Sequence, residues 1–429
     1  MNRIILLIGV FLFSVFLFGT AQTTENETAL SVQIRPRAEY RNGALMPRQK
    51  GQPAAGFINN RARLSLDYKR TDNLILRISA QHVGVWGQDP QIDKNGRFIL
   101  NEAWARLNFG EGFFTQLGRQ SLVYDDERIL GGLDWNVAGR FHDALKLGYE
   151  NTANKLHLIV AFNQNDERII GGTYYVPGAQ PYKTMQTLWY QYKEAEAPLS
   201  VSVLLMNLGQ EGGDSETKAS KTRYMQTLGT NLSYMPAGWR FDGSFYYQTG
   251  KTTAGTDISA WMGSVKATYT IDHQWGAFLG TDYLSGDKEG DSTFKAFNPL
   301  YGTHHKFYGS MDYFYASNFI GGVNPGLWDI YLGLTSKASS KVDLSLNYHY
   351  FRMASDVTAK DKTISKGLGS EIDFQLNWNV MPDVRLSVGY SVMVGTESMD
   401  VVKGGDHKSW QDWGWLSLNI NPRVFISKW

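Results

Sequence analysis

Arginine residues recur at every second position near the start of the chain, and this spacing suits the binding of anions. Arg35, Arg37 and Arg41 stand two and four residues apart, and Arg61 and Arg63 repeat the pattern shortly afterwards. Residues two apart share one face of a β-strand. A guanidinium group grips a carboxylate or phosphate through two parallel hydrogen bonds. We therefore expect a cationic surface that contacts an anion or nearby carboxylates.

The segments that would position these arginines alternate between polar and apolar residues, which is the pattern of β-strands. In Arg140–Glu150, for example, Leu145, Leu147 and Tyr149 share one face while Lys146 takes the other. Eighteen such segments follow one another between residues 30 and 425, joined alternately by short turns and long polar loops. We predict an all-β fold, a transmembrane antiparallel up-and-down β-barrel of about 18 strands. Its short turns would be periplasmic and its long loops extracellular.

The composition agrees with a barrel and argues against other classes. The chain has no cysteine, which excludes a disulfide framework and thiol chemistry. Aromatic residues make up 14% of it, and its 44 glycines exceed the average of about 7%. Beyond the N-terminus, no apolar run approaches the roughly 20 residues of a spanning helix. A soluble β-sandwich is the alternative, but it rarely needs so many strands.

The N-terminus has the features of a signal peptide. Arg3 gives a charged start, Ile4–Phe18 is apolar, and Gly19–Ala21 supplies small residues before Gln22. An N-terminal membrane helix is the alternative, although the run is short for one. We expect a signal peptide over residues 1–21 and a single outer-membrane barrel domain over residues 22–429. The expected location is the outer membrane of a Gram-negative bacterium.

The polar faces of the strands would line the lumen of this barrel. The N-terminal half is the more basic, so we expect a cationic wall with interleaved acids. The arginines could instead pair with acids such as Glu39 and Asp67 and simply fill the lumen. From strand phase, the residues predicted to line the pore are Arg35, Arg37, Arg41, Arg61, Arg63, Arg77, Glu102, Arg106, Arg140, Lys146, Arg240 and Arg385.

Other polar clusters have residue types that bind metals. Asp125–Glu127 and Asp287–Asp291 carry the carboxylates that calcium prefers, but neither stretch has a complete ligand loop. His304 and His305 with Asp312 lack a third well-spaced ligand. We expect solvated loop charges here, and no metal or cofactor.

Catalysis by a barrel hydrolase would need a Ser or Asp beside a His on the barrel wall. His142 and Asp143 are sequence neighbours within a strand, so their side chains face opposite sides. They cannot form a dyad there, and we expect no enzymatic activity.

Several motifs resemble those of a known family. GRQSLVYDDERILGGLDWNVAGRFHDALKL (Gly118–Leu147) resembles the Gly-Arg-Gln … Asp-Trp … Arg-x-Phe/His-Asp signature of the alginate export family of outer-membrane barrels. NEAWARLNF (Asn101–Phe109) and the strand end Ser285–Asp287 add to the resemblance. FNPLYGTHHKFYGSMDYF (Phe297–Phe314) resembles the long loop of the Bacteroidetes-type members of that family. Together these motifs cover most of the chain.

The resemblance implies a monomeric 18-stranded barrel whose Arg- and Lys-lined pore passes an acidic polysaccharide. The signature positions in this chain are Arg119, Asp134, Trp135, Arg140 and Asp143. We add Arg119, Asp134 and Trp135 to the predicted pore residues, with the last two shaping a loop that narrows the pore. Arg119 lies out of the inward phase of its strand, so a β-bulge or strand end would have to turn it inward.

We therefore expect a passive, anion-preferring outer-membrane channel for an alginate-like acidic polysaccharide or oligosaccharide. Its expected partners are outer-membrane lipid and the anionic glycan, with no nucleic acid; a periplasmic partner is not defined by the sequence. One alternative is a general or small-solute porin whose inner charges are structural. Another is a barrel enzyme or surface-binding protein that grips sugars with the long loop Asp287–Pro325.

Overall fold

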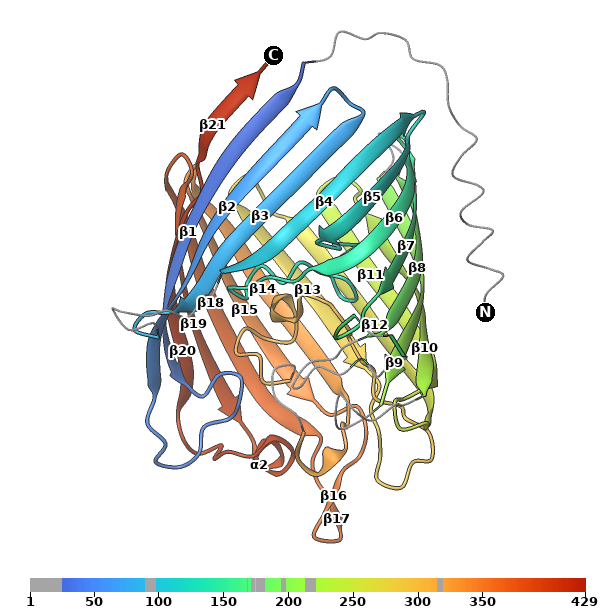
Figure 1. Cartoon of the computed structure of the whole chain (residues 1–429). Coiled ribbons are helices and arrows are strands. Elements are labelled where there is room, and N and C mark those ends of the chain that lie inside the picture. The colour runs from blue at the N-terminus through green and yellow to red at the C-terminus, as the bar shows by residue number, and fades with distance from the viewer. Residues whose placement is uncertain are drawn as a thin grey trace.

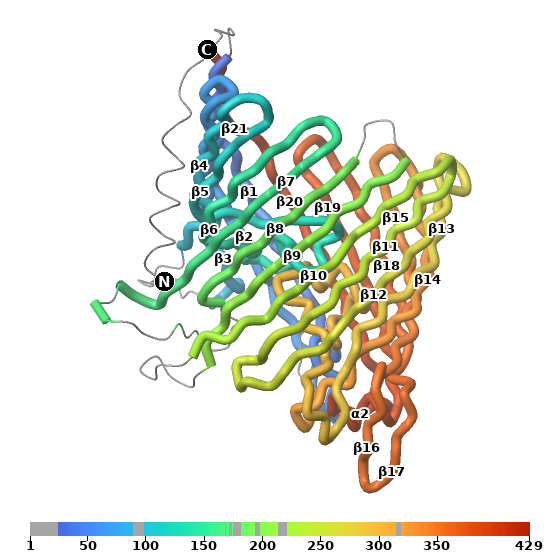
Figure 2. The backbone as a smooth tube through the Cα atoms, turned by 90° about the vertical axis from the view of Figure 1, so that its right-hand side faces the viewer, coloured from blue at the N-terminus to red at the C-terminus, as the bar shows by residue number. Residues whose placement is uncertain are grey.

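The computed structural model describes residues 25–88, 98–167, 169, 170, 174, 182–193, 198–212, 221–314 and 319–429. In these residues, eighteen antiparallel strands close into a barrel (Figures 1 and 2). This confirms the predicted fold class and strand number. The expected signal peptide, residues 1–21, lies outside the described residues.

Each strand pairs with its sequence neighbours around the barrel. The strands of the first half are β1 (Glu27–Asn42), β2 (Ala55–Arg70), β3 (Leu74–Val85), β4 (Phe98–Gly110), β5 (Phe113–Gln120), β6 (His142–Glu150), β7 (Asn154–Phe162), β8 (Thr184–Lys193) and β9 (Leu199–Glu211). Those of the second half are β10 (Thr222–Tyr234), β11 (Trp239–Lys251), β12 (Asp257–Thr270), β13 (Trp275–Leu284), β14 (Leu327–Ser339), β15 (Val342–Arg352), β18 (Gly367–Met381), β19 (Val384–Gly395), β20 (Gln411–Ile420) and β21 (Arg423–Lys428).

The last crossing of the wall is divided between β20 and β21, and both pair with β1 to close the barrel. The sequence predicted one continuous segment, Trp413–Phe425. Pro422 interrupts it because proline has no N–H to donate to the ladder. The Pro422 carbonyl still accepts from the N–H of Val32 at 3.1 Å, and the register with β1 shifts between Leu30 and Ser31. The closing seam is therefore continuous but locally irregular.

The two ends of the barrel differ in the length of their connections. Short turns such as residues 71–73, 111–112 and 382–383 lie at one end, together with the start of β1 and the C-terminus (Figure 1). The hairpin of β16 (Thr358–Ala359) and β17 (Lys362–Thr363) extends from the opposite end (Figure 1). Short helices occur only in long connections among the described residues, namely η1 (His304–Lys306), η2 (Ile320–Gly322) and α2 (Glu397–Lys403). None of the described helices is long and apolar enough to cross a bilayer.

The alternation of each strand separates two environments. On β5, the Leu117 side chain points outward and is 61% exposed, whereas Gln116 and Gln120 point inward and are buried. On β2, Leu64 is exposed outside while Arg61 is fully buried inside. An apolar outer face can contact lipid, and the polar inner face faces the lumen.

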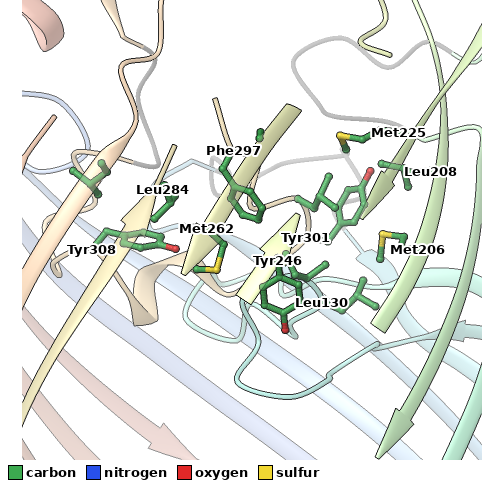
Figure 3. Close-up of a cluster of buried hydrophobic side chains, with 14 of the residues drawn as sticks. Leu130, Met206, Leu208, Met225, Tyr246, Met262, Leu284, Phe297, Tyr301 and Tyr308 are labelled. Carbon is green, nitrogen blue, oxygen red and sulfur yellow. The ribbon is translucent and has the colours of Figure 1, made fainter. Parts of the chain in front are cut away.

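The apolar core of this barrel lies inside the lumen. Figure 3 shows Leu130 and Tyr301, from two connecting loops, beside Tyr246 and Met262 from the wall strands. All four of these side chains are buried. Burying a side chain of this size contributes about 1.5–3 kcal/mol, so apolar packing holds the loops inside the barrel.

Candidate functional site

The connection between β5 and β6, residues 121–141, crosses the lumen, and we call it the inner loop. Near its start, the Tyr124 hydroxyl lies 2.9 Å from His157 Nδ1 on β7. The Asp125 carboxylate then accepts from Trp189 Nε1 on β8 at 2.9 Å and from Ser202 on β9 at 2.5 Å. The Tyr124 and Asp125 side chains of the inner loop therefore bind three successive wall strands, β7, β8 and β9.

The middle of the inner loop is fixed to β13 by a buried ion pair. The Arg128 guanidinium donates to both carboxylate oxygens of Asp282, at 2.9 and 3.0 Å. The same guanidinium lies 3.9 Å from the ring centroid of Phe307 and donates to the Tyr308 hydroxyl at 3.3 Å. Phe307 and Tyr308 belong to residues 285–326, which connect β13 and β14 and which we call the long loop. Arg128 thus joins both loops to the wall.

The tip of the inner loop is held on the other side of the barrel by Arg35, Arg37 and Arg61, which we call the arginine clasp. Arg35 Nη1 and Arg61 Nη1 donate to the two carboxylate oxygens of Asp134, at 2.8 and 2.6 Å. Arg37 donates to the carbonyl oxygen of Trp135 at 2.8 Å. Arg61 also donates to the carbonyls of residues 136 and 137, at 2.8 and 2.6 Å. The clasp therefore binds one carboxylate and a row of main-chain oxygens.

The Asp134 carboxylate explains why two arginines can stand side by side. Arg35 and Arg61 are direct cross-strand partners on β1 and β2, and like charges in such positions repel. Partial desolvation by the surrounding protein opposes ionisation of Asp134, but the charges of Arg35 and Arg61 outweigh it and hold its pKa below its usual range. The carboxylate group remains 71% exposed, so it faces water while it neutralises the pair.

Trp135 fixes the inner loop to the long loop. The Arg37 guanidinium lies 3.9 Å from the Trp135 ring centroid, and the His305 ring stacks on the indole at 4.1 Å with an interplanar angle of 13°. The rings of Trp413 and Trp415, from the last strand, meet Trp135 edge to face. Trp135 is therefore a contact point between β1, β20 and both loops.

The carboxylates opposite the clasp form a second inward surface. Asp282, Asp329, Glu371 and Asp373 come from β13, β14 and β18, and we call them the acidic wall. Glu371 accepts from the N–H of Met311 in the long loop at 2.8 Å. His349 Nδ1 on β15 lies 3.0 Å from Asp329. The acidic wall therefore binds the loops and a histidine, and its carboxylates are buried.

A glycine allows the long loop to approach Glu371 closely. Gly309 has a φ of +83°, which L side chains rarely adopt. A Cβ atom at this position would lie 2.7 Å from Glu371 Oε2. The long loop can dock on the acidic wall because this position carries no side chain.

The cations of β1–β6 outnumber the carboxylates on the inward face, and we call this surface the basic wall. Glu39 pairs with Arg37 and Arg41, at 2.8 and 2.7 Å. Arg77 pairs with two carboxylates, and Arg106 with one. Its cations include Arg35, Arg37, Arg41, Arg61, Arg63, Arg77, Arg106 and Lys146, and its carboxylates include Glu39, Asp67, Glu102 and Glu150.

Two cations of the basic wall have no carboxylate partner within the described part of the chain. Arg63 donates through Nε and Nη2 to the amide oxygen of Gln81, at 2.9 and 2.6 Å. The Lys146 ammonium lies 5.6 Å from the Tyr124 ring centroid. A neutral amide and an aromatic ring do not neutralise a cation, so Arg63 and Lys146 are each without a direct carboxylate contact among these residues.

The other predicted pore residues lie apart from the clasp. Arg140 donates to the carbonyl of Gly302 at 2.7 Å and so links the inner loop to the long loop. Arg240 points inward near the short-turn end and pairs with Asp242 at 2.8 Å. Arg385 also points inward by strand phase at that end, and it is exposed.

Arg119 does not join the inward set, and its predicted pore-lining position is corrected. It shares the outer face of β5 with Leu117 and pairs with Asp143 at 2.9 and 3.0 Å. Its guanidinium lies 4.2 Å from the Phe141 ring centroid. The pairing of β5 with β6 is regular, so no bulge turns the side chain inward.

The stretches weighed as metal sites use their polar atoms within the protein. Glu127 Oε2 accepts from the hydroxyl of Thr303 at 2.7 Å. His305 Nδ1 lies 2.8 Å from Asp312 Oδ2. Burial lowers the pKa of His304 to about 3, so this residue stays neutral. Within the described residues, the three potential ligands that lie close together are Asp400, Asp406 and His407, beside α2.

Sequence reasoning missed the contacts that dock the loops. Arg128 stands beside three acids, which made the stretch resemble solvated loop charge. His305 and Trp413 contact Trp135 from distant parts of the sequence. A loop has no periodicity that could indicate such partners, so the composition of the stretch was the only signal.

Comparison with known families identifies a match over most of the chain. A family model described as alginate export matches residues 27–399. Comparison with curated protein sequences finds no match.

Solved porin structures share the fold at low sequence identity. OccK9 (OpdG) of Pseudomonas aeruginosa is 12% identical, with a TM-score of 0.60 over 94% of this chain and 98% of that chain. OpdK of Pseudomonas aeruginosa, solved with vanillate, is 10% identical, with a TM-score of 0.60 over 93% and 99%. A BenF-like porin from Pseudomonas fluorescens Pf-5 is 10% identical, with a TM-score of 0.61 over 92% and 99%. These likenesses concern the fold, which is that of outer-membrane porins.

Proposed function

Because this chain belongs to the alginate export family and has the fold of an outer-membrane channel, we propose that its pore prefers anions and passes an acidic polysaccharide or oligosaccharide. The observation that carries the proposal is that Arg63 and Lys146 on the basic wall have no direct carboxylate partner within the described residues. The family and the fold support a channel rather than an enzyme.

The mechanism is electrostatic. A lumen lined by one sign of charge raises the local concentration of the opposite ion. Arg63 and Lys146 attract the carboxylates of a uronate chain, while the interleaved acids Glu102 and Glu150 keep each contact weak. Conduction requires binding that is strong enough for entry and weak enough for release. The polymer then moves down its concentration gradient from one cation to the next.

The single-channel reversal potential in asymmetric KCl tests the anion preference. We expect the wild-type reversal potential to lie towards the equilibrium potential of chloride. In the double variant Arg63→Glu/Lys146→Glu it should shift towards the equilibrium potential of potassium. Arg119→Gln is the matched control because Arg119 lies on the outer face of the barrel. A reversal potential that is the same in the double variant and the wild type would contradict the proposal.

A second candidate function is favoured by the arginine clasp. Arg35, Arg37 and Arg61 use their donors to hold the inner loop, which fits a small-solute porin with structural inner charges. This candidate expects weak ion selectivity and no block when oligoalginate is added to one side. Concentration-dependent block by oligoalginate would favour the polysaccharide channel instead.

We also propose that residues 1–21 are a signal peptide that is removed on export, which leaves one barrel domain that works as a monomer. N-terminal sequencing of the protein isolated from outer membranes tests the first point, with Gln22 as the expected first residue. Crosslinking in native membranes tests the second, with the mass of a single chain and no crosslinked dimer or trimer expected.

A further inference from the structure

A polar cavity of about 480 Å³ lies against the closing seam of the barrel. Its walls come from β1, β2, β3, the turn between β18 and β19, and the last strand. We propose that this cavity, the seam pocket, is a binding site for one acidic sugar unit of the hexuronate type. The proposal rests on the proposed function, because it assigns a binding site in the lumen to the same anionic glycan.

The irregular seam shapes the pocket. Pro422 divides the last strand, and the register shift places Ser31 of β1 opposite Arg423 of β21. The N–H of Asn421 donates to the carbonyl of Asp383 at 2.9 Å, which ties the neighbouring turn to the break. Side chains from the break and from the turn therefore line the same space.

The three arginines of the pocket differ in whether a carboxylate contacts them. Arg77 is matched, since its guanidinium donates to Asp67 at 3.0 Å and to Glu102 at 2.8 Å. Arg63 bonds only to a neutral amide, as described above. Arg423 is exposed and has no hydrogen-bond or ion-pair partner within the described ranges. Two guanidinium groups therefore keep free donors, which is the arrangement that binds a carboxylate.

The remaining lining suits the hydroxyl groups of a sugar. Ser31 contributes a hydroxyl and Asn421 a side-chain amide. The Ser65 hydroxyl and the Gln33 amide also line the pocket, but they bond to Ser79 and to Asn419 and Arg61, respectively. The carboxylate of Asp383 can accept from a sugar hydroxyl. The lining contains no aromatic or aliphatic side chain, so the pocket does not fit a flat apolar ligand. Its volume falls within the range of about 300–1,000 Å³ found for small-molecule sites.

The position of the pocket gives it a place in the transport path. It opens near the short-turn end, which is periplasmic in outer-membrane barrels. Gln33 of the pocket accepts from Arg61 of the clasp at 3.3 Å, so the pocket lies directly on the periplasmic side of the inner loop. A uronate bound here would lie on the periplasmic side of the inner loop.

Isothermal titration of the full barrel in nanodiscs tests the pocket, with a mannuronate disaccharide as the probe and neutral mannobiose as its uncharged counterpart. We expect Arg423→Gln to weaken disaccharide binding at least about fivefold, because a charge-assisted contact is lost. Arg240→Gln is the control, since Arg240 lies inward at the same end but outside the pocket. Asp383→Asn should raise the affinity, because the amide oxygen can still accept from a sugar hydroxyl while the negative charge that repels the uronate is removed.

The outcomes separate the pocket from the proposed function. Equal affinities in the wild type, Arg423→Gln and Asp383→Asn would overturn the pocket, as would equal binding of mannobiose. If the reversal potential of that wild type still indicates anion preference, the channel function stands without the pocket. Asp383→Asn keeps the test decisive if Arg423→Gln fails to fold, because a gain of affinity requires a folded barrel.

Discussion

The basic wall and the acidic wall hold the inner loop with opposite arrangements of charge. On the basic wall, the barrel supplies the guanidinium groups, and the inner loop supplies Asp134 and main-chain carbonyls. On the acidic wall, the barrel supplies the carboxylate of Asp282, and the inner loop supplies Arg128. The acidic side chains are buried, whereas Asp134 is 71% exposed.

This difference separates two uses of charge in one lumen. Removing one partner of a buried ion pair costs about 3–5 kcal/mol, because the other charge stays in a poorly solvated site. Exposed pairs contribute about 0–1 kcal/mol but remain in contact with mobile ions. The acidic wall therefore fixes both loops through buried carboxylates. The basic wall anchors the inner loop through the clasp and also presents charge to mobile ions in the lumen. Substitutions on the two walls should have different readouts.

The largest expected effect follows Asp282→Ala, which leaves Arg128 buried without its principal partner. We expect a loss of about 3–5 kcal/mol and release of the inner loop. Thermal unfolding measures the first effect, and limited proteolysis between residues 121 and 141 measures the second. The double variant Arg128→Leu/Asp282→Leu should recover much of the stability, because neither charge remains. A wild-type melting temperature for Asp282→Ala would remove the distinction between the two walls.

Asp134→Ala should act on selectivity more than on stability. It removes an exposed carboxylate, while the fully buried Arg61 keeps its bonds to the carbonyls of residues 136 and 137. Arg35 and Arg61 then have no carboxylate partner in the clasp. A charge at roughly 8 Å in water changes the energy of a passing ion by about 0.5 kcal/mol, or about twofold in concentration. We expect the chloride-to-potassium permeability ratio to rise by about that factor. Asp242→Ala, which leaves the exposed Arg240 unpaired outside the clasp, is the comparison that should show a smaller change.

Protonation of Asp134 at low pH should change the selectivity in the same direction as Asp134→Ala. The pKa of Asp134 is held below its ordinary range in the folded protein, so its contribution to the clasp is complete above the unfolded-state pKa. That contribution is lost only as the pH falls through the lower folded-state pKa. We expect constant selectivity from neutral pH into mild acid, then a rise in anion preference in stronger acid. Asp134→Asn should abolish this transition in reversal-potential measurements.

Arg119→Gln should have the smallest effect. Its pair with Asp143 is partly exposed on the outer face, and such pairs contribute about 0–1 kcal/mol. We expect a nearly unchanged melting temperature and an unchanged reversal potential. A shift in selectivity would mean that the outer face influences the pore, which the present arrangement of the walls does not predict.

The barrel itself was predictable from the sequence, because strand pairing needs only a period of two and closure. The inward phase of Arg35, Arg37, Arg61 and Arg63 followed from the same rule, and so did the outward phase of Arg119. The loop contacts were not predictable. Arg61 binds main-chain carbonyls, and every residue carries such an oxygen, so no residue type at the other end of the contact indicates it.

The contacts of the clasp determine which substitutions the inner loop can accept during evolution. Apart from Asp134, the clasp recognises main-chain oxygens of residues 135–137, which persist whatever side chains stand there. A substitution at position 137 therefore leaves the accepting carbonyl in place, whereas the Asn136 side chain also accepts from the N–H of Ala138 at 2.9 Å. Substitutions in the inner loop can therefore change the surface that a transported solute meets, while the main-chain contacts that hold the loop on β1 and β2 are kept.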